Sequence, residues 1–346
     1  MTASASGTRE APRIGFVGQV DHGALEDGRA LFLEAEELGY DVGYVRVRHL
    51  QDALSSPLLF LSALGQHTSH IQLGTAVIPL RFENAGRLAE DLATADLLTG
   101  GRLRPGLGSG YSAQDAIYTR AFGALHGDRT DHVDRVLHDL LELVGGEIVS
   151  GADQHIEGVD PGTPLRIQPQ APGLRERLAY GAASPQRAAM AGHAGLGLQL
   201  ATMAPDDGSG RSFELLQLEA LEAYREASRE AGHGEGHVMV SRQMIPVESE
   251  EDLERYVSLI PRERTAGPGV SAEHQAQEIG GNAAVFSRIV IDDPGVVAQA
   301  LVADAVVQAA DEISLVLPFG APAADQRAML GTFARHVVPH LLTAIV

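Results

Sequence analysis

Short runs of β-branched and aliphatic residues alternate along the chain with longer segments whose apolar residues recur every three or four positions. The first pattern is typical of buried strands and the second of amphipathic helices. Ala24–Leu38 has the helical spacing, and Gly39 stands where a helix C-cap glycine would, directly before the next strand-like run. Strands that alternate with helices in this way indicate a parallel sheet.

Eight segments have the composition of strands, which is the number that closes a (β/α)8 barrel. They lie at Ile14–Val17, Val42–Val47, Ile71–Ile78, Leu103–Leu107, Leu178–Ala182, Leu198–Ala201, Val238–Ile245 and Ile313–Leu317. We therefore predict an α/β fold, a TIM barrel formed by one domain over residues 13–346. Residues 1–12 are small and polar, and we expect them to form a disordered N-terminal tail.

Two stretches, near residues 145–175 and 260–287, are too long for ordinary loops and are interpreted as insertions. Long loops on a barrel often cover the site. The second insertion follows the seventh strand, so we expect it to act as a lid. For the first, a surface excursion with no role at the site is an equal alternative.

Composition narrows the classes of function. The chain has 346 residues, of which 44% are apolar, so it can build a large core, and its net charge of −20 disfavours binding to nucleic acid. The absence of cysteine excludes thiolate nucleophiles and cysteine-ligated metal, so redox chemistry would require a bound cofactor. The histidine pairs lack a third ligand, and no metal site is predicted. Without a signal peptide or an apolar stretch of ~20 residues, we expect a cytoplasmic protein that does not bind membranes.

A glycine-rich turn, Gly106–Tyr111 (GLGSGY), follows the fourth predicted strand. It does not match the dinucleotide-binding fingerprint, because the third glycine of that motif would fall on Tyr111. Its backbone N–H groups could bind an anion or a flat ring at the end of a strand. A plain tight turn is the alternative.

Several sequence motifs occur along the chain in the same order as in one known protein family. They are AEELGYDVGYVRVRHL (Ala35–Leu50), SSP (Ser55–Pro57), TSHIQLGTAVIPL (Thr68–Leu80), NAGRLAED (Asn84–Asp91), LLTGGRLRPGLGSG (Leu97–Gly110), LAYGAASPQRAAMAGHAGLGLQLA (Leu178–Ala201), DDPGVVAQAL (Asp292–Leu301) and EISLVLPFG (Glu312–Gly320). Together they resemble the bacterial luciferase-like flavin monooxygenases, a (β/α)8 family, from about Ile14 to the C-terminal helix. The chain is most similar to an FMN-dependent subgroup of unknown substrate that has R-V-H-H-F after the second strand.

The resemblance implies an enzyme that uses reduced FMN, supplied by a separate reductase, and O2 to oxidise a small organic substrate. It implies that Ala183 and Ser184, at the start of the helix Pro185–Gly192, bind the FMN phosphate, where helix N–H groups favour an anion. Arg187 would add a charge-assisted bond or point into solvent.

The same resemblance implies further cofactor contacts. Thr75-Ala76 matches the position of a non-prolyl cis peptide bond under the flavin ring. Ser109 stands where luciferase itself has a phosphate-binding arginine, and Gly110 and Tyr111 adjoin it in the glycine-rich turn.

Arg48-His49 align with the family's His-His pair, so arginine replaces the first histidine. We expect His49 to face the flavin and to hydrogen-bond the reacting oxygen or the substrate, and Arg48 to supply a fixed positive charge. Because neighbouring strand residues point to opposite faces, one of the two would be a surface residue if the strand continued through them. Arg242, in the segment Ser241–Gln243, is a third candidate, for an anionic ligand.

Two other functions remain open: a deazaflavin-dependent oxidoreductase of the same fold, and a flavin-binding protein without catalytic activity. The substrate is also open, with aldehydes, alkanesulfonates and amines all possible. As the family commonly forms homodimers, we expect one here, with the apolar helices Pro57–Gln66 and Glu83–Leu98 at the interface.

Overall fold

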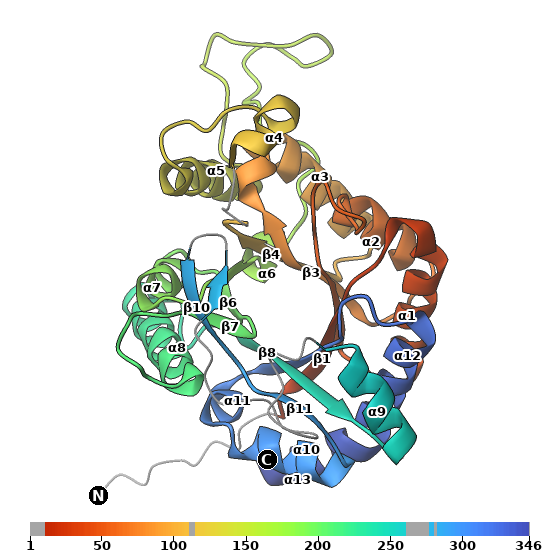
Figure 1. Ribbon diagram of the computed structural model, residues 1–346. Helices are drawn as coiled ribbons and strands as arrows, with labels where there is room; N and C mark the ends of the chain where they lie inside the picture. The colour runs from red at the N-terminus through yellow and green to blue at the C-terminus, as the bar shows by residue number, and fades with distance from the viewer. Residues whose placement is uncertain (1–10, 111–114, 261–276, 280–281, 346) are drawn as a thin grey trace, which may run out of the picture.

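The computed structural model describes residues 11–110, 115–260, 277–279 and 282–345. Eight parallel strands close into a barrel in the order β1-β2-β3-β4-β5-β6-β8-β12, and β12 pairs with β1 (Figure 1). The predicted fold class is therefore confirmed, and each predicted strand overlaps an observed one. The barrel strands are β1 (Arg13–Gly18), β2 (Val42–Val45), β3 (Gln72–Pro79), β4 (Leu103–Gly108), β5 (Ala179–Gly181), β6 (Gly197–Leu200), β8 (Val238–Pro246) and β12 (Glu312–Val316).

Helices surround the barrel and cover its outer face (Figure 1). They are α1 (Leu25–Glu37), α2 (Pro57–Gly65), α3 (Ala85–Leu98), α4 (Asp115–Phe122), α5 (Arg129–Val144), α6 (Leu174–Arg177), α7 (Pro185–His193), α8 (Phe213–Glu230), α9 (Glu250–Ser258), α10 (Pro294–Ala303), α11 (Ala305–Ala309), α12 (Ala323–Thr332) and α13 (Val338–Ile345), with shorter turns η1 (His22–Ala24), η2 (Leu80–Phe82) and η4 (Phe333–Val337). Side-chain oxygens that accept from early backbone N–H groups cap many of them; examples are Asn84, Asp128, Ser184 and Ser212. Nowhere in the described part of the chain is a helix both long and apolar enough to span a bilayer.

Apolar side chains fill two layers. The larger layer lies between the strands and the helices, and a smaller cluster inside the barrel contains Val17, Val42, Tyr44, Met239 and Val316. Gly74 makes room for this inner cluster, because a Cβ there would lie 2.3 Å from the Tyr44 ring. The lumen below the C-terminal strand ends is therefore packed, not open.

Four strands lie outside the predicted set. β11 (Ile289–Asp292) pairs with the second half of β8, and β7 (Met203–Pro205), β10 (Asn282–Phe286) and β9 (Gln277–Ile279) form a small antiparallel sheet. β9 and β10 belong to the predicted lid insertion, of which residues 261–276 and 280–281 lie outside the described residues.

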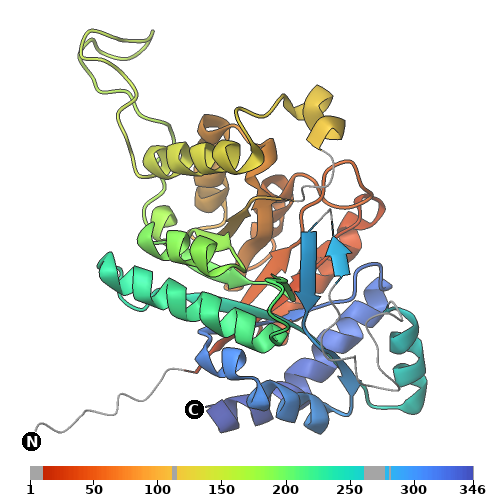
Figure 2. The ribbon, with the colours of Figure 1, turned by 60° about the vertical axis from the view of Figure 1, so that its left-hand side comes forward.

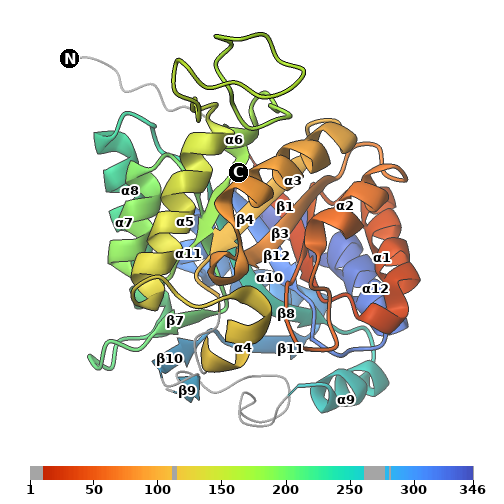
Figure 3. The ribbon, with the colours of Figure 1, turned by 90° about the horizontal axis from the view of Figure 1, so that it is seen from above.

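The first insertion is not a lid. It connects α5 to α6, and Figures 2 and 3 show residues 145–173 in yellow-green projecting from the end of the molecule opposite the small sheet. None of its residues lines the central cavity described below. The physical reason is topological: a connection from a barrel helix to the next strand returns to the N-terminal face, whereas sites form at the C-terminal face.

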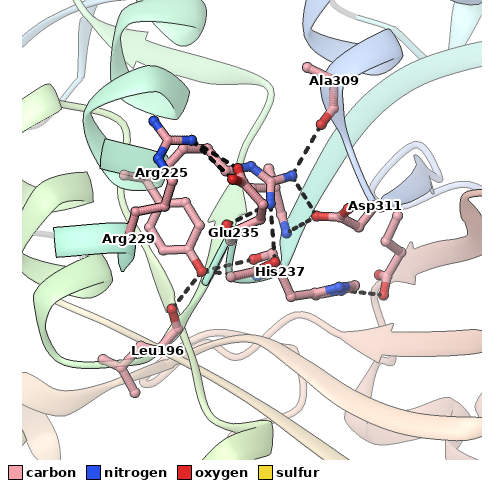
Figure 4. Close-up of polar contacts among 11 residues, drawn as sticks. Leu196, Arg225, Arg229, Glu235, His237, Ala309 and Asp311 are labelled. Atoms are coloured by element: carbon pink, nitrogen blue, oxygen red, sulfur yellow. Dashed lines mark hydrogen bonds and ion pairs between the residues drawn. The ribbon is translucent and has the colours of Figure 1, made fainter. Parts of the chain in front are cut away.

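A polar network fastens the end of α8 to the start of β8 and β12 (Figure 4). Arg225 donates to the Asp311 carboxylate at 2.8 Å and to the carbonyl oxygens of Glu235, Gly236 and Ala309. The Asp311 carboxylate also accepts from the backbone N–H of Val238 at 2.8 Å. Arg225 thus joins three segments that are distant in sequence.

We expect Arg225→Ala to lower the free energy of unfolding by roughly 1.5–3 kcal/mol, which is the range for hydrogen bonds to charged groups. The full range applies because the Arg225 side chain is only 13% exposed, so water cannot replace the lost partners. Arg229→Ala on the same helix is the control. Its ion pair with Glu235 is 53% and 62% exposed, so we expect about 0–1 kcal/mol. Urea denaturation of both variants measures the difference, and equal losses would contradict the assignment of the network to Arg225.

Candidate functional site

A cavity of about 1130 Å³ opens at the C-terminal ends of the barrel strands. Its floor is the inner apolar cluster, represented by Val17, Ala76, Met239 and Val316. The small antiparallel sheet contributes Met203 and Ala284 to the wall. Ligand sites usually occupy about 300–1,000 Å³, so this cavity has room for a cofactor and a small substrate together.

The cavity brings most of the predicted site residues together, and the prediction that the site lies at the C-terminal strand ends is consistent with this position. The lining residues among them are Arg48, His49, Ala76, Ser109, Gly110, Ala183, Ser184 and Arg187. Thr75 and Arg242 are buried elsewhere, and Tyr111 lies outside the described residues.

His49 lies in an aromatic environment at the cavity wall. Its ring centroid is 4.6 Å from that of Phe82 and 4.9 Å from that of Phe122, both in edge contacts. Its Nε2 is buried and has no hydrogen-bond partner among the described residues. Burial lowers the pKa of His49, so the neutral imidazole is favoured.

Arg48 and His49 both reach the cavity because β2 ends at Val45. The strand alternation that would have placed one of them on the surface therefore no longer applies. Leu50 follows with a φ of 57°, a left-handed conformation that marks the turn of this loop.

The N-terminus of α7 opens into the cavity. The Ser184 hydroxyl accepts a hydrogen bond from the backbone N–H of Arg187, and Pro185 occupies the first turn, where its missing N–H costs nothing. The hydroxyl hydrogen of Ser184 is left to donate to a ligand. This helix end provides partial positive charge beside small residues, which suits a phosphate.

Arg187 lines the cavity but already has strong partners. Its guanidinium donates to both carboxylate oxygens of Asp134, at 2.6 and 3.0 Å, and to the Tyr180 hydroxyl at 2.7 Å. Burial disfavours the charged form, but these bonds outweigh it and raise the pKa of Arg187. The predicted solvent position is therefore wrong, and the alternative, a charge-assisted bond from Arg187 to the phosphate, stays a prediction.

The glycine-rich turn after β4 contributes Ser109 and Gly110 to the wall. Gly110 has a φ of 73°, and a Cβ there would lie 2.7 Å from Pro79, so glycine is required on both grounds. The Ser109 carbonyl accepts from Arg129, whose charge is paired with Asp115.

Thr75 has a position different from the one predicted. Its hydroxyl donates to the Gly106 carbonyl at 2.8 Å and accepts from the Gly106 N–H at 3.0 Å, so it joins β3 to β4 where their register shifts. The side chain is fully buried and does not line the cavity. The non-prolyl cis peptide bond is Ala76–Val77, one bond later than the predicted Thr75-Ala76.

Arg242 does not reach the cavity, so the expectation that it binds an anionic ligand is corrected. Strand alternation places Met239 and Ser241 in the cavity wall, and Arg242 on the opposite face of β8. There its guanidinium pairs with Asp304, at 2.7 and 3.2 Å, and lies over the Phe213 ring.

Among the polar lining residues that sequence reasoning missed are Gln199 and Arg46. Gln199 is 5% exposed, its Nε2 donates to the Thr75 carbonyl at 3.3 Å, and its Oε1 has no partner among the described residues. Arg46 lies in the loop after β2. The signal for Gln199 was a polar residue inside an apolar strand; for Arg46 it was a basic residue at a strand's C-terminal end.

A family model described as luciferase-like monooxygenase matches residues 7–289. The chain belongs to this family. The predicted membership is confirmed.

The relatives differ in the activities that their names give. The chain is 27% identical over 352 residues, 95% of this chain and 98% of the relative, to an F420-dependent glucose-6-phosphate dehydrogenase of Mycolicibacterium gilvum (strain PYR-GCK). It is 31% identical over 133 residues, 38% of this chain, to a 4-hydroxyprotoasukamycin monooxygenase of Streptomyces nodosus subsp. asukaensis, of whose length the match spans 35%. The relatives therefore include a monooxygenase and an F420-dependent dehydrogenase.

Solved structures agree on the fold. One similar structure is the oxygenating constituent of 3,6-diketocamphane monooxygenase of Pseudomonas putida in complex with FMN, with a TM-score of 0.68 at 16% identity over 96% of this chain and 99% of that one. Another is an F420-dependent secondary alcohol dehydrogenase, with a TM-score of 0.65 at 15% identity over 96% and 99%.

Proposed function

We propose that the protein is an FMN-dependent monooxygenase that uses reduced flavin and O2 to oxidise a small organic substrate. The observation that carries this proposal is the N-terminus of α7, where Ser184 opens into a cavity large enough for flavin and substrate. A phosphate at this point would meet the helix dipole and a hydroxyl donor.

The residues present fit a flavin. Beside the phosphate position, Ala183, Ser109 and Gly110 offer small side chains and backbone groups that a flat ring system can approach, and Ala76 lies on the floor. Bound reduced flavin supplies the activation of O2, which no side chain of this chain can provide. The apolar floor and the small sheet place apolar side chains around the proposed reacting centre, an environment that disfavours water.

His49 and Arg48 are proposed to act on the substrate side. The neutral His49 has a buried nitrogen that finds no hydrogen-bond partner in the described part of the chain, so it can exchange a proton with the reacting group. Arg48 is proposed to supply a fixed positive charge at the cavity wall.

The second candidate is an F420-dependent oxidoreductase, favoured by the relative that matches over almost the full length of both chains. A flavin-binding protein without catalysis is the third. Oxygen uptake coupled to a flavin reductase, measured with candidate substrates, separates an oxygenase from both, since only an oxygenase couples O2 consumption to substrate oxidation.

We also propose a transient complex with that reductase and a homodimer through α2 and α3. Leu59, Leu97 and Leu98 on these helices are exposed by 76%, 53% and 52%, which suits an apolar interface. A dimer mass by light scattering at micromolar concentration is expected.

Ser184→Ala is expected to weaken FMN binding by roughly 1.5–3 kcal/mol, about 10- to 150-fold, because a hydrogen bond to a charged phosphate is lost. Flavin fluorescence titration measures the change. Ser212→Ala is the matched control: it removes the equivalent cap of α8, so it lowers stability similarly without changing FMN affinity. If both variants bind FMN like wild type, Ser184 does not contact the phosphate.

A further inference from the structure

Arg46 is held in the cavity wall by partners that leave its charge unneutralised. Its Nη1 donates to the Gln19 side-chain oxygen at 2.7 Å, and its guanidinium carbon lies 4.0 Å from the centroid of the Phe319 ring. Gln19 is oriented in turn by a 3.0 Å hydrogen bond to Asp21. A neutral amide and an aromatic face fix the geometry of the cation but supply no counter-charge.

The other lining arginines with known partners differ in this respect. Arg187 pairs with Asp134, and Arg129 pairs with Asp115. Arg46 has no carboxylate within ion-pair distance among the described residues. In a partly buried position, such a charge is stabilised most by an anionic ligand.

The position of Arg46 separates it from the proposed phosphate site. It follows β2, and its partners Gln19 and Phe319 follow β1 and β12, which are neighbouring strands. Ser184 follows β5, three strands away around the barrel from β2. Arg46 is thus a candidate anion-binding position separate from the proposed phosphate site.

Apolar surface surrounds the second position. Phe319 lies directly against the guanidinium and is 44% exposed, and Val17 and Val316 form the adjacent floor. A ligand that satisfies both features carries an oxyanion on an apolar body. A carboxylate matches the planar guanidinium with two parallel hydrogen bonds, and it is the simplest oxyanion that an apolar organic body carries.

We infer that the substrate is an organic carboxylate whose anionic group pairs with Arg46 and whose apolar body packs against Phe319. This inference rests on the proposed function, which assigns the rest of the cavity to FMN. It makes Arg46 a specificity-determining residue that binds the end of the substrate remote from the reaction.

The test uses fluorinated fragments followed by 19F NMR with FMN-saturated protein. 4-Fluorobenzoate is expected to bind about tenfold or more tightly than the neutral 4-fluorobenzamide. Arg46→Gln is expected to reduce benzoate binding to the benzamide level, and Arg46→Lys to retain part of it. Arg87→Gln, the same charge change on the exposed face of α3, is expected to bind like wild type.

Three results would overturn the inference: benzoate binding unchanged in Arg46→Gln, equal binding of benzoate and benzamide to wild type, or loss of FMN affinity in Arg46→Gln, which would assign the arginine to the cofactor. Tighter binding of 4-fluorobenzenesulfonate than of the benzoate would overturn the choice of carboxylate. The titration is repeated without FMN, so a failure of wild type to bind FMN would contradict the proposed function and still leave the Arg46 comparison readable.

Discussion

Replacing His49 by alanine is expected to lower turnover at saturating substrate by about 10²-fold or more, the lower end for loss of a general acid or base. The structure supplies the reason: a neutral imidazole lines the cavity with one nitrogen unpaired by the described residues. Affinity for FMN is expected to stay near the wild-type value, because the proposed phosphate site lies on another element, the N-terminus of α7.

Two comparisons make the His49 result specific. His67→Ala changes an exposed histidine and is expected to leave turnover unchanged. Arg48→Ala is expected to raise KM, most for anionic substrates, with a smaller effect on turnover. Wild-type turnover in His49→Ala would remove this residue from the reaction.

The pH dependence of turnover has a defined sign. Because burial lowers the pKa of His49 below 6.5, the neutral form persists at pH values where a free histidine is already protonated. Activity that depends on neutral His49 is therefore retained below pH 6.5 and is lost as pH falls through the lowered pKa. As pH falls from 6.5 to the lowered pKa, His49 is protonated in the unfolded chain before it is protonated in the folded chain. This favours unfolding, so the contribution of His49 to the free energy of unfolding also falls over this pH range.

Replacing Arg242 by leucine is expected to lower the free energy of unfolding by about 3 kcal/mol or more, the cost of breaking a buried ion pair. The Arg242 side chain is 2% exposed and that of Asp304 is 16% exposed, so the remaining carboxylate loses its partner in a poorly solvated place. Affinity for FMN and for 4-fluorobenzoate is expected to be unchanged, because Arg242 faces away from the cavity. Urea denaturation and the two titrations measure these quantities.

Further variants isolate the charge effect at Arg242. Arg87→Leu breaks an ion pair whose arginine is 66% exposed, and about 0–1 kcal/mol is expected. Adding Asp304→Asn to Arg242→Leu removes the unpaired charge and keeps an oxygen to cap α11, so part of the stability should return. If the Arg242→Leu variant is as stable as wild type but binds ligand more weakly, Arg242 would contribute to ligand binding after all.

The strands and the barrel were predictable because each strand is a short apolar run buried on both faces and each helix has an apolar stripe. β11 and the small sheet were missed, since strands of three to five residues outside the barrel give no repeating signal. The sequence order of the βα units also placed Ser184 and His49 at the correct end of the barrel.

Side-chain direction was harder to predict than position along the chain. Arg242 was assigned to the site although Ser241, its neighbour on β8, is the residue whose face points inward. Thr75 was expected to contact the cofactor, whereas its hydroxyl forms hydrogen bonds with the carbonyl and the N–H of Gly106. The pairing of Arg187 with Asp134, 53 residues away, has no local signature, and only the folded chain shows that Gln19 and Phe319 are the neighbours of Arg46.

The most direct test of the proposed function is a parallel titration of the wild-type protein with FMN, riboflavin and F420, followed by the absorbance and fluorescence of each bound cofactor. We predict that FMN binds most tightly and that riboflavin, which lacks the phosphate, binds about tenfold or more weakly. Tight binding of F420 with no measurable binding of FMN would contradict an FMN-dependent monooxygenase.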